Sequence, residues 1–119
     1  MSAIVSGEPV RLSVCHCLAC QRRSGGPFGA QARFQPSDVI LNGDHQSWTR
    51  TADSGNPIEH HFCPICGSTV WYHSRPNWEL FAIPIGAFAD PEFPAPEFSI
   101  YEARKHTWVT IGAKVEHHD

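Results

Sequence analysis

Hydrophobic and polar residues alternate in short runs along most of the chain, which is the pattern of half-buried β-strands. Over residues 8–14, the apolar side chains of Val10, Leu12 and Val14 face one side and polar side chains face the other. Comparable runs predict further strands over residues 28–34, 45–51, 58–62, 68–73 and 79–86, with weaker candidates over 98–102 and 108–115. The pattern therefore predicts an all-β fold built from short strands.

Residues that break regular structure separate these runs. The chain contains 9 glycines and 10 prolines, which leave little room for long helices. Residues 21–27 are predicted to form a loop after at most one helical turn, and residues 36–38 a turn or short helix. Residues 90–96 are predicted to be an extended linker, and residues 116–119 a polar tail.

The pair Asn42-Gly43 predicts a tight reversal, because both residue types tolerate positive φ. We therefore expect residues 45–51 to return antiparallel to the apolar stretch over residues 39–41. Pro84 lies in the strand predicted over residues 79–86 and favours an edge position or a bulge there, since proline cannot donate a backbone hydrogen bond.

Length and charge narrow the class of protein. The chain has 119 residues, and we expect residues 1–119 to form a single domain. Its net charge is −3, and the charged residues form no basic stripe, which argues against a nucleic-acid partner. No apolar run approaches the roughly 20 residues of a membrane-spanning helix, and residues 1–8 lack the pattern of a signal peptide. We therefore expect a cytoplasmic protein with no membrane segment.

The five cysteines form two tight groups rather than a dispersed disulfide framework. Cys15, Cys17 and Cys20 have C-x-C-x2-C spacing, and Cys63 and Cys66 have C-x2-C spacing, both of which let thiolates converge on a soft metal ion. The first three are predicted to hold a Zn²⁺ ion and to leave its fourth position open, as in catalytic zinc sites. A thiol that bound there would lose its proton.

Cys63 and Cys66 admit two interpretations. They can close a four-cysteine structural site with two of the first three cysteines, or they can bind a second ion, for which histidines are the remaining candidate ligands. Gly67 follows the pair and is expected to take left-handed backbone geometry. We therefore expect the two cysteines to lie on the tight turn of a zinc-knuckle hairpin.

Histidines and arginines near the cysteines are further candidates. His16 lies between two candidate ligands, so its side chain is expected to point away from the metal. Of His60 and His61, one is expected to face the site and the other solvent. Arg22 and Arg23 directly follow the third cysteine and can bind a carboxylate on a substrate, although a solvated pair is the simpler interpretation.

Two motifs occur at a characteristic separation: residues 15–29 read CHCLACQRRSGGPFG and residues 62–68 read FCPICGS. Together they resemble the glutathione-dependent formaldehyde-activating enzyme family, which shares its domain with centromere protein V. The resemblance extends from about residue 10 to the end of the chain. It implies a twisted all-β tent fold of short antiparallel strands with zinc-knuckle loops and up to two zinc ions.

The resemblance also implies different roles for the two groups of cysteines. Cys15, Cys17 and Cys20 would hold the zinc associated with activity, whereas Cys63 and Cys66 would share a structural zinc with an earlier C-x-C-G motif. Residues before the first cluster contain no cysteine. Three explanations are open: the natural chain starts further upstream, the second site is empty or completed by other groups, or its cysteines join the first cluster. We expect packing or dimerisation to compensate for a lost structural zinc, with the four tryptophans as candidate interface residues.

The activity implied by the resemblance is that of a zinc-dependent carbon–sulfur lyase. It would condense glutathione, or a related thiol, with formaldehyde to S-hydroxymethylglutathione, so the expected partners are a glutathione-like thiol and an aldehyde. Arg22 or Arg23 would bind the carboxylates of the tripeptide, and zinc would polarise the carbonyl or bind the thiolate. The alternative is a non-catalytic, zinc-stabilised binding or scaffold domain.

Overall fold

The chain forms ten short strands and one α-helix within the residues that the computed structural model describes, 1–112 and 114–119. The strands are β1 (Ser2–Val5), β2 (Arg11–Cys15), β3 (Gly29–Phe34), β4 (Val39–Asn42), β5 (Gln46–Thr51), β6 (Pro57–Phe62), β7 (Thr69–Ser74), β8 (Phe81–Pro84), β9 (Phe98–Ile100) and β10 (Glu116–His117). The helix is α1 (Leu18–Ser24), and short 3-10 helices span Pro36–Asp38, Ile85–Phe88 and Glu102–Arg104. This composition confirms the all-β prediction.

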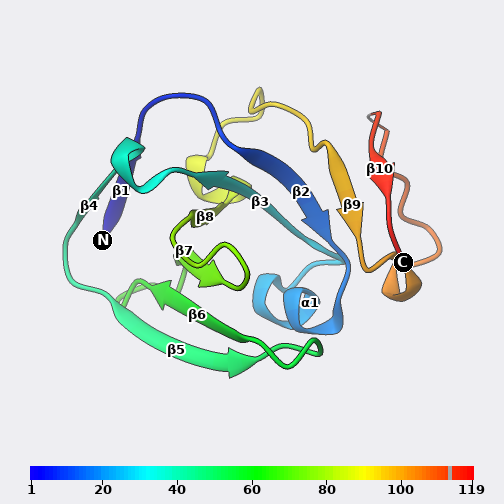
Figure 1. The fold of residues 1–119 in the computed structure, drawn as a ribbon, viewed down its shortest axis with the longest axis horizontal. Coiled ribbons are helices and arrows are strands. Elements are labelled where there is room, and N and C mark those ends of the chain that lie inside the picture. Colours follow the sequence, from blue (N-terminus) through cyan, green and yellow to red (C-terminus); the bar gives the residue numbers. More distant parts are fainter. Residues whose placement is uncertain (113) are drawn as a thin grey trace.

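The strands form two sheets. One has the order β10-β9-β2-β3-β8-β7-β6-β5, and the other pairs β1 with β4. Most neighbours are antiparallel, but β9 runs parallel to both β2 and β10. Figure 1 shows α1 between β2 and β3, which are interior strands of the large sheet, and β5 and β6 at one end of it. No described helix is long and apolar enough to cross a membrane.

The hydrophobic core lies where the two sheets meet. Its centre is a cluster of buried side chains at Leu12, Ala32, Phe34, Trp71 and Ile83, and apolar residues of β1 and β4 pack against it. Because alternate residues of a strand point to opposite faces, the period-two pattern placed these residues on the buried face. Of the other tryptophans, Trp48 and Trp108 are exposed, at 56% and 72%. Because Trp71 is buried in this core, it is not available as one of the interface residues expected from the sequence.

The hairpin expected around Asn42-Gly43 was predicted wrongly. Gly43 does take positive φ (+86°), but β4 pairs with β1, and β5 pairs with β6 instead. The reason is packing. When β1 pairs with β4, the apolar side chains of Ala3, Val5 and Val39 are buried against the core. The turn residue predicted local geometry correctly, whereas the partner of each strand was decided by burial at a distance.

The loop expected over residues 21–27 is partly helical. Helix α1 begins after Cys17, whose sulfur accepts a hydrogen bond from the backbone N–H of Cys20 at 3.3 Å. It ends at Gly25, which has a φ of +72° and whose N–H donates to the carbonyl of Gln21. A cysteine acting as N-cap is an unusual start signal, which explains why sequence reasoning missed most of the helix.

The C-terminal predictions also need correction. Residues 108–112 and 114–115 form no strand, and residue 113 lies outside the described part. The expected polar tail instead contains β10, which adds to β9. Pro84 is the last residue of β8, which lies between β3 and β7 and is not an edge strand. Pro84 pairs with Gln31 of β3, whereas on the other side of β8 only Ala82 pairs with β7 in the described part, so no pairing residue on the β7 side faces the proline that lacks an N–H.

Candidate metal centre and pocket

Three cysteines gather where β2 leads into α1. Cys15 ends β2, Cys17 caps α1 and Cys20 lies in its first turn. Their sulfur atoms all lie within 4.8 Å of one another. Tetrahedral zinc with Zn–S bonds of about 2.3 Å separates sulfurs by about 3.8 Å, so small side-chain adjustments would seat an ion. The donor set and its spacing therefore fit a soft metal such as zinc.

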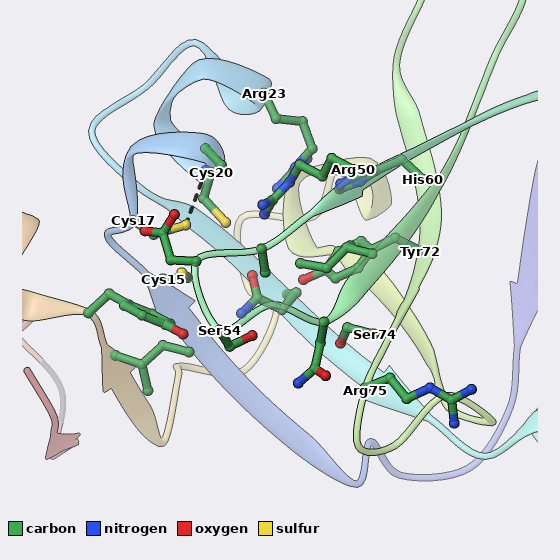
Figure 2. Close-up of a pocket in the computed structure, with 18 of the residues that line it drawn as sticks. Cys15, Cys17, Cys20, Arg23, Arg50, Ser54, His60, Tyr72, Ser74 and Arg75 are labelled. Carbon is green, nitrogen blue, oxygen red and sulfur yellow. Dashed lines mark hydrogen bonds between the residues drawn. The ribbon is translucent and has the colours of Figure 1, made fainter.

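The thiols of this cluster form hydrogen bonds with one another. Hydrogen bonds from the Cys15 and Cys20 thiols lower the pKa of Cys17, and the same contact with Cys17 raises the pKa of Cys15. Figure 2 shows the additional hydrogen bond from the backbone of Cys20 to the sulfur of Cys17. The first thiolate therefore forms at Cys17, and three thiolates together require a cation.

Cys63 and Cys66 lie apart from this cluster, on the turn between β6 and β7. Gly67 has a φ of +80° and donates its N–H to the carbonyl of Cys63 at 2.8 Å, which confirms the expected left-handed turn. Cys66 is exposed, and its thiol donates to Ser68 Oγ at 3.4 Å. Among the described residues, neither cysteine belongs to the group of close ligand atoms formed by the first three. The structure thus does not assemble the single four-cysteine site considered above.

His16 points away from the cysteines, as expected from its position between two of them. Its side chain is fully buried, its Nε2 lies 2.9 Å from Ser99 Oγ, and its ring packs edge-on against Phe28. Ser99 in turn donates to Glu102 at 2.7 Å. These contacts tie the start of α1 to β9 and help to hold the cysteine cluster in place.

The cysteines form one end of a pocket of about 190 Å³. Its walls come from β2, α1, β3, β5, β6, β7 and β9 and from the loop between β5 and β6, and they include Asp53 and four arginines: Arg23, Arg33, Arg50 and Arg75. Within the described residues, no carboxylate oxygen lies within 4.0 Å of a guanidinium nitrogen of these arginines. Four arginines against the single carboxylate of Asp53 leave the pocket with net positive charge, a property that favours an anionic ligand.

Of the two arginines singled out from the sequence, the structure brings only Arg23 to the pocket. Arg23 lies three residues after Cys20, so the two side chains share one face of α1. Arg22 is exposed and does not line the pocket. Consecutive helix residues point about 100° apart, which is why adjacent arginines have different surroundings.

Gly29 leaves the space that Arg23 and Cys20 occupy. It lies opposite Cys15 in the β2–β3 ladder, and a Cβ atom there would come within 2.9 Å of Arg23 Nη2 and 3.3 Å of Cys20 Cβ. We expect Gly29→Ala to displace both side chains and to weaken Zn²⁺ binding by about tenfold, as for changes around other metal ligands. Competition with a chelator measures this affinity. Gly86→Ala is the matched control, since no atom of the described residues lies within 4 Å of the Cβ it would add, and equal affinities of the two variants would contradict the packing argument.

His60 forms the wall of the pocket next to two of the arginines. On β6 it pairs with Trp48 of β5 and Tyr72 of β7, and its ring stacks on that of Trp48. The side chain is 4% exposed, and neither ring nitrogen has a hydrogen-bond partner within the described residues. Burial, followed by the charges of Arg23 and Arg50, lowers its pKa to about 4. His60 is therefore neutral at pH 7.

His61 lies on the opposite face of β6. Its ring stacks on Trp71 at 5.1 Å, and its Nε2 lies 2.6 Å from a carboxylate oxygen of Glu59. The expectation that one of the two histidines faces the site is met by His60. The expectation that the other faces solvent is wrong, because the rings of His45, Trp71 and His73 pack around His61 and leave its side chain 13% exposed.

Arg50 and Tyr72 were missed by sequence reasoning. Arg50 shares a face of β5 with Trp48, and burial raises the pKa of Tyr72, which keeps its hydroxyl protonated. Figure 2 shows this hydroxyl directed toward the cysteine end of the pocket and Arg23, Arg50 and His60 together on one side. The sequence signal that could have found Arg50 is the alternation along β5 and β6. It places residues 48, 50, 58 and 60 on one face, but this becomes visible only when the pairing of the two strands is known.

Comparison with known protein families gives one match. The model of the family described as glutathione-dependent formaldehyde-activating enzyme matches residues 2–104, which is most of the chain. The matched region contains the cysteine cluster, the Cys63–Cys66 turn and every residue that lines the pocket. No curated protein matches the chain.

Proposed function

The chain belongs to the glutathione-dependent formaldehyde-activating enzyme family, and we propose that it condenses glutathione or a related thiol with formaldehyde. The observation that carries this proposal is the pocket, which joins three clustered cysteines to four arginines without carboxylate partners in the described part. Glutathione has a thiol at its centre and a carboxylate at each end. A pocket with sulfur ligands at one end and cationic walls matches that distribution of groups.

Cys15, Cys17 and Cys20 are the residues that would hold zinc. Zinc at such a site lowers the pKa of a thiol, or polarises a carbonyl, at its open position. Cys63 and Cys66 are proposed as a second pair of metal ligands, which need further ligands from outside their turn. The free thiols of all five cysteines fit the reducing cytoplasm expected from the sequence.

The side chains of the pocket would bind and orient the two reactants. Arg23 and Arg50 would bind substrate carboxylates, because both line the pocket and neither has a carboxylate within 4.0 Å among the described residues. In the reaction a sulfur–carbon bond forms, the C=O double bond becomes a single bond and the thiol proton ends on that oxygen. The Tyr72 hydroxyl, which stays protonated, would donate a hydrogen bond to the aldehyde oxygen. Since thiols add readily to aldehydes, positioning is the main catalytic demand.

The proposal is tested by following formaldehyde and glutathione in the presence of zinc-loaded protein. We expect S-hydroxymethylglutathione to form faster than in buffer, in proportion to protein concentration. Bovine serum albumin at the same concentration controls for nonspecific thiol effects. A rate equal to that in buffer, with one zinc bound per chain, would refute the enzymatic reading and favour the non-catalytic zinc-stabilised domain.

The arginine contact makes a separate prediction. We expect Arg50→Gln to raise the KM for glutathione by about tenfold, because a hydrogen bond to a charged group contributes roughly 1.5–3 kcal/mol. The kcat should change less, since the carboxylates are remote from the reacting atoms. Arg22→Gln is the matched control, because Arg22 is exposed and outside the pocket. Unchanged KM in Arg50→Gln, or an equal increase in both variants, would exclude Arg50 from binding.

A further inference from the structure

Tyr101 has a backbone conformation that a bulky side chain rarely adopts. Its φ is +57° and its ψ is +41°, in the left-handed region where a residue with a Cβ atom is strained. Before it, His16 donates its N–H to the carbonyl of Ile100 at 3.0 Å. After it, Glu102 donates its N–H to the carbonyl of His118 at 2.9 Å, so the backbone is held on both sides. Residues that keep such strain cluster at active sites and ligand-binding sites, and the strain at Tyr101 therefore calls for a functional reason.

The left-handed turn brings the side chain of Tyr101 into the pocket that contains the cysteines. Ile100 is the last residue of β9 and lines this pocket, and in a continued strand the next side chain would point to the opposite face. Because the backbone turns at residue 101, Tyr101 lines the pocket as well. A glycine would make the same turn without strain. The strained conformation is therefore of use only for the position it gives to the tyrosine ring.

The register of the large sheet places Tyr101 beside the cysteine cluster. Ile100 pairs with Cys15, so Tyr101 comes directly after a neighbour of the first candidate ligand. Tyr101 is 39% exposed, which places it at the mouth of the pocket rather than at its floor. The loop between β5 and β6 lines the same pocket, and Figure 2 shows Ser54 of this loop on the side where Cys15 and Cys17 lie. Tyr101 and this loop thus border the cysteine end of the pocket.

We propose that Tyr101 is a specificity-determining residue whose ring limits the size of the molecules that reach the cysteine end of the pocket. The proposal rests on the proposed function, in which this limit selects formaldehyde over aldehydes with larger substituents. The addition forms one sulfur–carbon bond, turns the C=O double bond into a single bond and moves the thiol proton to that oxygen. The carbon keeps both of its other substituents, so the space around it decides which aldehydes react. Formaldehyde has two hydrogens there, and every other aldehyde has a larger group.

The first test compares formaldehyde with acetaldehyde, which differs from it by one methyl group. We expect Tyr101→Gly in the zinc-loaded protein to lower the formaldehyde-to-acetaldehyde ratio of kcat/KM by about tenfold, because one methyl group in a close-fitting pocket has an effect of this size. The change should come from faster reaction of acetaldehyde with glutathione. Tyr101→Phe keeps the ring and should keep the wild-type ratio. A lowered ratio in Tyr101→Phe would overturn the steric explanation, since only the hydroxyl is lost.

Ala89→Gly is the matched control for strain. Ala89 is the other non-glycine residue with positive φ (+51°) in the described part, and it does not line the pocket. Relief of strain alone would therefore change both glycine variants alike, whereas removal of the ring changes only Tyr101→Gly. We also expect Tyr101→Gly to melt a few degrees higher than Tyr101→Ala, which loses the ring but keeps the strain. An equal or higher melting temperature of Tyr101→Ala would contradict the left-handed backbone on which the proposal depends.

A second test measures access to the cysteines without the reaction. The full chain, reduced and freed of metal by a chelator, is alkylated with iodoacetamide or with the bulkier N-phenylmaleimide, and mass spectrometry follows each group of cysteines. We expect Tyr101→Gly to raise the rate of the bulky reagent, relative to the small one, by about tenfold at Cys15, Cys17 and Cys20. Cys63 and Cys66 do not line this pocket and serve as the reference within the same protein.

The two tests separate the size limit from the reaction. If wild type condenses glutathione with formaldehyde, but Tyr101→Gly changes neither the aldehyde ratio nor the preference between the alkylating reagents, the role of Tyr101 is overturned and the proposed function stands. If wild type accelerates neither aldehyde, but Tyr101→Gly admits the bulky reagent as expected, the size limit stands and the proposed function fails.

Discussion

Replacing Cys17 by serine is expected to remove the metal from the protein and to reduce thiol–formaldehyde condensation to the uncatalysed rate. Cys17 is the thiol at which the first thiolate forms, and its sulfur lies within 4.8 Å of the other two. Zinc sites with four ligands bind with roughly 10–16 kcal/mol, so one ligand accounts for roughly 3 kcal/mol and its loss for more than a hundredfold in affinity. Metal analysis after gel filtration, together with the condensation assay, checks both results.

Serine is the informative replacement because Cys17 also caps helix α1. Its sulfur accepts the backbone N–H of Cys20, and a serine hydroxyl performs the same role as a preferred N-cap. Cys17→Ala loses both the ligand and the cap, and should therefore be less stable than Cys17→Ser by about 1 kcal/mol in metal-free protein. One bound zinc per chain in Cys17→Ser, with wild-type affinity, would show that this sulfur is not a ligand.

The protein is expected to lose about 3 kcal/mol of stability through His60 as the pH falls from about 6.5 to about 4. Above pH 6.5 the imidazole is neutral in both the folded and the unfolded chain and contributes nothing. Between the two values the unfolded chain takes up a proton, whereas the folded chain, with a pKa of about 4, does not. Each pKa unit corresponds to about 1.4 kcal/mol, and below about pH 4 the contribution becomes constant.

The measurement is urea unfolding of wild type and His60→Phe across this pH range. Protonation of the cysteine ligands and of other histidines affects both proteins alike, so the difference between their unfolding free energies isolates His60. The advantage of His60→Phe should grow as the pH falls. A difference that stays constant between pH 7 and pH 4 would show that His60 titrates normally in the folded protein.

Local patterns in the sequence predicted the parts of the fold that depend on near neighbours. Alternation along the chain predicted most strands, and Gly67 predicted the left-handed turn after Cys66. The spacing of Cys15, Cys17 and Cys20 predicted that three sulfurs come together, because the first and the last are only five positions apart. These features depend on local backbone geometry and on short loops, and a few consecutive residues determine both.

Partners that are distant in the sequence were not predictable in this way. The pairing of β1 with β4, and of β5 with β6, was missed because the pattern shows that a strand has an apolar face but not which strand covers it. The same limit hid Arg50 and the roles of His60 and Tyr72. Each becomes part of the site only because β5, β6 and β7 lie side by side against the end of β2 and α1.

The amino-acid sequence by itself thus determined a β-rich chain with a three-cysteine cluster suited to a metal, and its motifs indicated the family that comparison then showed. Tertiary structure alone decided that Arg23 rather than Arg22 reaches the pocket, that Cys63 and Cys66 stay apart from the cluster, and that the ring nitrogens of His60 are buried with no hydrogen-bond partner among the described residues. The physical reason is that ligand spacing is a local property of the backbone, whereas burial and charge in a pocket sum over elements that only the packed sheets bring together.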